Sequence, residues 1–205
     1  MNVAKEAFAA REPLDVARLL QAEMAEHRTA FEATARAIGG PFEDALQLVA
    51  TAIESGGRLF LFGNGGSAAD AQHIAAECVI RYKADRAPIA AMALTTDTST
   101  LTACANDFSF DQLFARQIEA LARPGDVVLG LSTSGNSPNV VAGLKQARQQ
   151  RAATLGLTGE VGGKMNEHCD VLLCVPSKVT ARIQEMHILI GHMLCKALEQ
   201  RLGLV

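Results

Sequence analysis

The chain of 205 residues is predicted to fold as a three-layer α/β/α sandwich around a parallel sheet, preceded by N-terminal helices. Three observations predict this fold class. After Gly56 and Gly57, short apolar runs alternate with segments of helix length, which is the pattern of βαβ crossovers. The runs are apolar at nearly every position, as expected for strands that are covered on both faces. Finally, 49% of the residues are hydrophobic, which is enough to build one core.

The part of the chain before the sheet is predicted to form two amphipathic helices. Apolar residues recur at helical spacing over residues 14–37 and 42–53, and Gly39, Gly40 and Pro41 are expected to separate the two helices. The first helix precedes any strand, so its apolar face needs a partner, which could be another subunit or its own domain. We therefore expect a helical oligomerisation segment over residues 1–56 and a sheet domain over residues 57–205.

Five strands and a long final helix make up the expected sheet domain. The strands are residues 58–62, 89–94, 126–131, 153–157 and 171–175, and the final helix covers residues 179–202. Helix-length segments lie between the strands and are expected to provide the parallel crossovers.

The composition argues against several classes of protein. No apolar run approaches the ~20 residues of a membrane helix, and the first residues lack the pattern of a secretory signal, so we expect a cytoplasmic protein that does not act at a membrane. A net charge of −3 and 4% aromatic residues argue against a nucleic-acid partner. Five cysteines without a C-x-x-C pair are expected to be reduced thiols.

Two of the expected strands end in small, hydroxyl-rich turns. Gly-Asn-Gly-Gly-Ser follows the first strand at residues 63–67, and Ser-Thr-Ser-Gly-Asn-Ser follows the third at residues 132–137. Glycines permit close backbone approach, hydroxyls donate hydrogen bonds, and the N-terminus of the following helix favours phosphate. Ser67 and Ser137 could instead be ordinary helix N-caps. Two such turns at the carboxyl ends of strands favour a ligand crevice.

Other glycine and serine motifs fit the sequence less well. The first turn lacks the third glycine of a dinucleotide fingerprint, and the chain has no G-x-x-x-x-G-K-[ST] phosphate loop. The second turn lacks the G-x-S-x-G arrangement of a serine hydrolase. The motifs therefore do not require a nucleotide or a serine nucleophile.

Two helices carry side chains that could perform chemistry. His73 and Glu77 lie four residues apart and share one helix face, so they could hold a metal ion or form a surface ion pair. On the last helix, Gln184 and His192 share a broad face. His187 lies three residues from Gln184 and could replace His192. Spacing alone does not decide between these two histidines.

Five motifs occur along the chain: the two turns, the pair His73 and Glu77, Asn-Asp-Phe at 106–108, and Arg-Ile-Gln-Glu-x-His at 182–187. Their order and spacing resemble the phosphoheptose isomerase family within the sugar isomerase (SIS) fold. The resemblance covers residues 15–202. It implies a flavodoxin-like sheet, a homotetramer built partly on N-terminal helices, and conversion of sedoheptulose 7-phosphate to D-glycero-D-manno-heptose 7-phosphate, the first step in making surface-heptose (lipopolysaccharide) precursors.

The resemblance also implies roles for individual residues. Zn²⁺ would be bound by His73, Glu77, Gln184 and His192, which favours His192 over His187. The phosphate would be held by Ser67, Ser132, Thr133, Ser134 and Ser137. The sugar site would be lined by Asn64, Gly65, Gly66, Glu77, Asn106, Asp107 and Gln184. One departure is Ala181, where some family members carry Asp.

The reaction of such an isomerase moves a proton between adjacent carbons through an enediolate, so the site needs a base and groups that stabilise the enediolate. We expect Glu77 to be the base and His192 to be the opposing acid/base. The alternative is a non-catalytic SIS-domain module that associates with the bacterial replication initiator, which the sequence also resembles. That module lacks the counterparts of Glu77 and His192, so their presence here favours an enzyme.

Overall fold

A computed structural model describes residues 14–205 of the chain. The first thirteen residues of the predicted oligomerisation segment lie outside the described residues. Within residues 14–205, no helix combines the length and the apolar character that crossing a bilayer requires. All five cysteines lie in this part of the chain and are free thiols, as expected.

The centre of the molecule is a five-stranded parallel sheet with the strand order β2-β1-β3-β4-β5. This is the flavodoxin-like order, so the predicted fold class is confirmed. The strands are β1 (Leu59–Gly63), β2 (Ala91–Ala93), β3 (Val127–Ser132), β4 (Ala153–Thr158) and β5 (Val171–Cys174). Four of them lie within one residue of the predicted bounds. β2 is shorter than predicted because the backbone N–H of Ile89 bonds to Cys78 at the end of a helix instead of to a strand.

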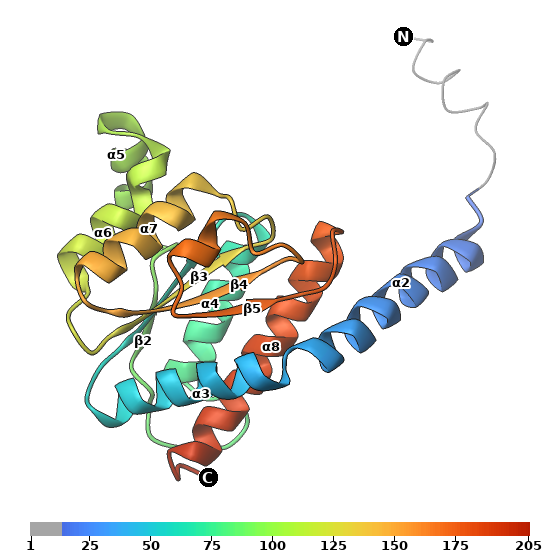
Figure 1. Cartoon of the computed structure of the whole chain (residues 1–205), viewed down its shortest axis with the longest axis horizontal. Coiled ribbons are helices and arrows are strands. Elements are labelled where there is room, and N and C mark those ends of the chain that lie inside the picture. Colours follow the sequence, from blue (N-terminus) through green and yellow to red (C-terminus); the bar gives the residue numbers. More distant parts are fainter. Residues whose placement is uncertain (1–13) are drawn as a thin grey trace.

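Helices cover both faces of the sheet and make the three predicted layers (Figure 1). One face is covered by α3 (Gly39–Glu54), α4 (Gly66–Val79) and α8 (Thr180–Arg201). The other is covered by α6 (Leu113–Leu121), α7 (Pro138–Gln149) and the 3-10 turn Gly163–Glu167, while α5 (Thr98–Asp107) and the 3-10 turn Phe110–Gln112 pack against α6 at the edge of this layer. Side chains of β1 alternate between the layers: Leu59 and Leu61 pack with α3, α4 and α8, whereas Phe60 and Phe62 pack on the opposite side.

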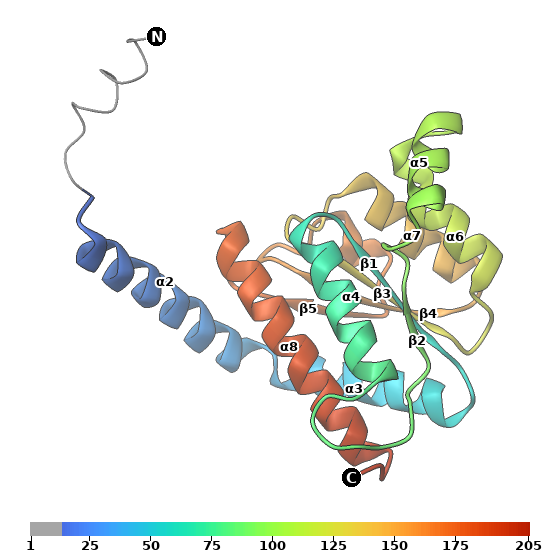
Figure 2. The same cartoon turned by 180° about the vertical axis from the view of Figure 1, so that it is seen from behind.

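The two N-terminal helices are nearly continuous, and one expectation about them is wrong. Gly39, Gly40 and Pro41 form the first turn of α3, and Ile38 is the one residue that separates α3 from α2 (Val16–Ala37). Proline fits a first turn because the N–H groups there have no partner within the helix. α3 packs on the sheet, whereas α2 extends away from the body of the molecule (Figure 2).

Candidate active site

The two hydroxyl-rich turns lie side by side at the carboxyl edge of the sheet. They follow β1 and β3, which are neighbouring strands with Gly63 opposite Leu131. The side-chain amides of Asn64 and Asn139 join the turns, because each donates a hydrogen bond to the other at 2.8 and 2.9 Å. Strand order reverses at this point of the sheet, and open α/β sheets bind ligands in such a crevice. The predicted sugar-lining residue Asn64 therefore also holds the crevice together.

The second turn gathers hydroxyl groups that do not cap a helix. Ser132 Oγ lies 2.9 Å from Ser137 Oγ and 3.4 Å from Ser134 Oγ. Ser137 is the N-cap residue of α7, but its side chain makes no capping hydrogen bond within the described chain. Ser67 is buried inside the first turn of α4, whose N-cap is Gly65. Neither serine side chain therefore caps its helix: Ser67 lies inside the helix, and the Ser137 hydroxyl pairs with that of Ser132.

Thr133 and Ser134 border a cavity of about 320 Å³ beside the second turn. Glu160 and Lys178 line its other side, and their charged groups lie 3.7 Å apart. A hollow lined by hydroxyls and charges at the end of a strand suits a polar, anionic ligand.

Helices α4 and α8 lie beside each other and run in the same direction (Figure 2). Residues later in α4 contact residues later in α8, as expected for parallel helices: Gly191 lies against Ile74, and Cys195 Sγ lies 3.9 Å from Cys78 Sγ. This alignment brings His192 of α8 level with His73 of α4.

His73, Glu77 and His192 form a compact cluster between these two helices. His73 Nε2 lies 3.0 Å from His192 Nε2, and Glu77 Oε1 lies 3.2 Å from His73 Nε2 and 3.5 Å from His192 Nε2. The Glu77 side chain is 16% exposed, against 52% for His73 and 34% for His192. Glu77 Oε2 is buried and has no hydrogen-bond partner among residues 14–205. Glu77 Oε1 thus faces both imidazoles, whereas Oε2 is enclosed by the protein.

The spacing of these three side chains fits a zinc ion. Nitrogen and oxygen ligands bind Zn²⁺ at about 2.0–2.2 Å in a tetrahedron, which places any two of them about 3.3 Å apart. The three ligand atoms of the cluster are 3.0 to 3.5 Å apart. Three of the four predicted metal ligands are therefore already brought together.

The fourth predicted ligand, Gln184, lies nearer the start of α8 than His192 does. Its amide packs over Gly66 in the first turn of α4, so closely that a Cβ at Gly66 would be 2.6 Å from Gln184 Nε2. Eight residues separate Gln184 from His192, which is about 12 Å along the helix axis. Gln184 is therefore placed near the first turn, beside the expected phosphate site.

His187, the alternative to His192, is fully buried away from the cluster. Its Nε2 lies 3.2 Å from the carbonyl oxygen of Thr158 at the end of β4. Burial lowers the pKa of His187 to about 4, so the ring is neutral at physiological pH. The geometry brings His192, and not His187, to His73 and Glu77.

Two predicted sugar-site residues are not brought to this cluster. Asn106 and Asp107 end α5 on the other face of the sheet, where both are exposed and the Asn106 amide donates to Asp107 Oδ1 at 2.7 Å. α5 follows the carboxyl end of β2, and Asn106 and Asp107 lie at the opposite end of this helix.

Asp70 is a member of the site that the sequence motifs did not mark. It lies three residues before His73 on α4, and its Oδ2 is buried without a partner in the described part of the chain. Burial raises the pKa of Asp70 to about 6, against the opposing effect of His73 and His192. The spacing of residues 70, 73 and 77 on one helix face is the signal that could have identified it.

The fold and the crevice define the class of protein. A family profile described as the SIS domain matches residues 22–159, so the chain is a SIS-domain protein. It is 56% identical over 183 residues to the phosphoheptose isomerase of Paramagnetospirillum magneticum, covering 89% of this chain and 95% of that one. The chain belongs to the phosphoheptose isomerase family, and the predicted family and enzyme class are confirmed.

Solved structures agree with this assignment. A phosphoheptose isomerase from Neisseria gonorrhoeae superposes with a TM-score of 0.85 at 42% identity, covering 90% of this chain and 99% of that one. A phosphoheptose isomerase from Francisella tularensis superposes with a TM-score of 0.88 at 33% identity, covering 91% of this chain and 100% of that one.

Proposed function

We propose that the chain converts sedoheptulose 7-phosphate to D-glycero-D-manno-heptose 7-phosphate, as the first step in making lipopolysaccharide heptose precursors. The observation that carries this proposal is the environment of Glu77. One carboxylate oxygen faces two imidazoles, and the other is buried without a hydrogen bond among the described residues. A carboxylate held in this way is suited to accept a proton from a bound sugar.

The phosphate of the substrate binds at the turns in this proposal. Ser67, Ser132, Thr133, Ser134 and Ser137 supply hydroxyls, and the N-termini of α4 and α7 favour the negative charge. Ser67 and Glu77 are ten residues apart on α4, about 15 Å along the axis, and helical side chains lean toward the N-terminus. The distance between the Ser67 hydroxyl and the Glu77 carboxylate is shortened by this lean, and it suits an extended sugar with its phosphate at Ser67 and its reacting carbons at Glu77.

The proton transfer is assigned to Glu77 and His192. Glu77 removes the proton from one carbon and returns it to the next, while His192 exchanges protons with the substrate oxygens. Asn64, Gly65, Gly66, Asn106, Asp107 and Gln184 line the sugar. His73, Glu77 and His192 would hold Zn²⁺, with Gln184 as the proposed fourth ligand. When bound, Zn²⁺ would polarise the carbonyl and hydroxyl oxygens as a Lewis acid.

Incubation with sedoheptulose 7-phosphate tests this function against the binding-module alternative. Purified protein is expected to form the aldose product, and it is expected not to form a complex with the replication initiator. Initiator binding without turnover would reverse the assignment. Because sugar phosphates do not cross membranes unaided, a cytoplasmic location belongs to the same proposal.

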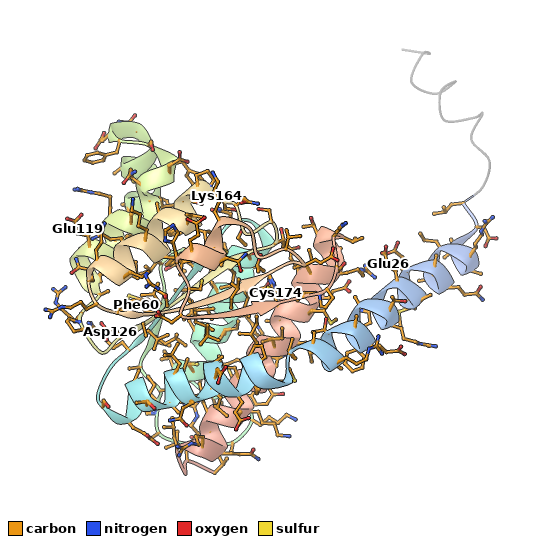
Figure 3. All side chains as sticks on the ribbon, viewed as in Figure 1. Glu26, Phe60, Glu119, Asp126, Lys164 and Cys174 are labelled. Carbon is orange, nitrogen blue, oxygen red and sulfur yellow. The ribbon has the colours of Figure 1, made fainter. Side chains whose placement is uncertain are left out.

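The proposal includes a homotetramer in which residues 1–56 contribute the oligomerisation segment. Along α2, the exposed large apolar side chains are Val16, Leu19, Leu20, Met24 and Phe31. The outer part of the helix projects from the body, so Val16, Leu19, Leu20 and Met24 lack a cover from their own domain (Figure 1). Phe31 borders a hollow between α2, α3 and α8. Its polar side is anchored to α8: Arg182 lies 3.0 Å from Glu23 and 3.7 Å from Glu26, which is labelled on α2 in Figure 3. A second copy of the chain is the cover that we propose.

Light scattering of the native protein tests this assembly. Leu20→Lys places a charge in the apolar row and is expected to reduce the tetramer to smaller species. Gln21→Lys adds the same charge at the adjacent exposed position and is expected to leave the tetramer intact. Equal behaviour of the two variants would contradict the proposed role of the row.

A further inference from the structure

The loop between α4 and β2, residues 80–90, is fastened by a buried ion pair. Arg86 Nε lies 2.9 Å from Glu199 Oε1 of α8, and the two side chains are 0% and 3% exposed. Because charges are stable in a protein interior only when they are paired and hydrogen-bonded, such a pair holds its surroundings in one arrangement.

Arg86 also binds the end of the helix that carries Glu77. Its guanidinium donates to the carbonyl oxygens of Glu77 at 2.8 Å and Cys78 at 2.7 Å. Carbonyls in the last turn of a helix have no partner within the helix and attract a cation. The loop is thereby fixed to both helices of the candidate site.

This fastening places Tyr82 against His192. The backbone N–H of Tyr82 donates to Glu199 Oε1 at 3.1 Å, the same oxygen that accepts from Arg86. The Tyr82 ring then lies 5.7 Å from the His192 ring, between centroids, with an angle of 33° between their planes. The His192 ring meets the His73 ring edge-on at 5.1 Å. His192, which is 34% exposed, thus gains a neighbour that limits its rotation.

We propose that Tyr82 is a positioning residue, whose ring holds the imidazole of His192 toward His73 and Glu77. The inference rests on the proposed function of that cluster as a metal and proton-transfer site. Side chains that orient metal ligands commonly change metal affinity 10- to 100-fold when they are removed. The ring surface performs this task in Tyr82, so the hydroxyl group is dispensable.

Three variants test the proposal: Tyr82→Ala, Tyr82→Phe and the control Asp85→Ala. Asp85 is exposed in the same loop. The Zn²⁺ dissociation constant is measured on metal-stripped protein by competition with a coloured chelator, and kcat and KM are measured for sedoheptulose 7-phosphate. Tyr82→Ala is expected to raise the Zn²⁺ dissociation constant at least about tenfold and to lower kcat with little change in KM. Tyr82→Phe and Asp85→Ala are expected to match the wild type within about twofold.

Two outcomes would overturn the proposal. One is an unchanged Zn²⁺ affinity and kcat in Tyr82→Ala. The other is an equal loss in Tyr82→Phe, which would assign the effect to the hydroxyl instead of the ring. The wild-type protein separates this proposal from the proposed function. If it turns over the sugar but binds no Zn²⁺, the role of the metal is refuted, and the difference in kcat between Tyr82→Ala and Tyr82→Phe decides the role of Tyr82. If it does not turn over the sugar, the proposed function itself is refuted.

Discussion

Replacing Gly66 by alanine is expected to disturb the active site without destabilising the fold. A Cβ at this position would lie 2.6 Å from Gln184 Nε2, whereas ordinary van der Waals contact begins at 3.4 Å. The amide must therefore move by at least about 0.8 Å, the difference between these distances. Gly66 does not have a positive φ, so its backbone accepts alanine. Alanine is favoured over glycine in helices by up to about 1 kcal/mol.

The expected result is a variant with unchanged or slightly raised Tm and reduced activity. A displacement of about 1 Å in a substrate-positioning group can lower the rate about 100-fold, so we expect kcat/KM for sedoheptulose 7-phosphate to fall between about 10- and 100-fold. Gly40→Ala is the matched control, because it lies in the first turn of α3 and its new Cβ would meet nothing within 4 Å.

A double-mutant cycle shows whether the loss acts through Gln184. In a Gln184→Ala background the clash is absent, so Gly66→Ala is expected to cause no further loss of kcat/KM. Two results would refute the reasoning: activity within twofold of the wild type in the single variant, or the same fold loss in both backgrounds.

Three further predictions follow from the site and its surroundings. Ser134→Ala and Ser137→Ala are each expected to raise KM about fivefold, equivalent to about 1 kcal/mol for one hydrogen bond, and an unchanged KM in both would contradict phosphate binding at the turn. Dialysis against a chelator is expected to remove activity at a temperature where circular dichroism still reports a folded protein, and Zn²⁺ is expected to restore it; full activity in metal-free protein would contradict the metal mechanism. His187 has a pKa of about 4 in the fold, against about 6.5 when unfolded, so the unfolded state binds more protons between these values. Stability is therefore lost as the pH falls from about 6.5 to 4, by roughly 3 kcal/mol from this group. Urea unfolding at pH 7 and at pH 4.5 is expected to show a smaller drop in the free energy of unfolding for His187→Gln than for the wild type, and an equal drop in both would contradict this.

The sequence predicted the sheet well because a strand buried on both faces leaves a continuous apolar run. It failed at Gly39, Gly40 and Pro41, since glycine and proline mark loops in general but are also tolerated in a first helical turn. The projection of α2 away from the body could not be read from its periodicity, which indicates an apolar face without saying what covers it.

The candidate site was predictable where it depends on spacing within one helix. His73 and Glu77 are such a pair, whereas the choice of His192 over His187 came from the family resemblance. The physical reason for that choice is the parallel alignment of α4 and α8, a tertiary contact between residues 119 positions apart. The reciprocal amide pair of Asn64 and Asn139 depends on tertiary contact in the same way.

Turnover by Glu77→Gln tests the central claim most directly, because this change keeps the shape of the side chain and removes the proton acceptor. The measurement is the initial rate of aldose formation from sedoheptulose 7-phosphate, with sugar-phosphate binding measured in parallel. Glu119→Gln on α6, across the sheet from the site, is the control (Figure 3). We expect kcat to fall at least about 100-fold in Glu77→Gln while binding of the sugar phosphate and the activity of Glu119→Gln stay near wild type. Turnover by Glu77→Gln at a rate near that of the wild type would contradict the assignment of Glu77 as the base.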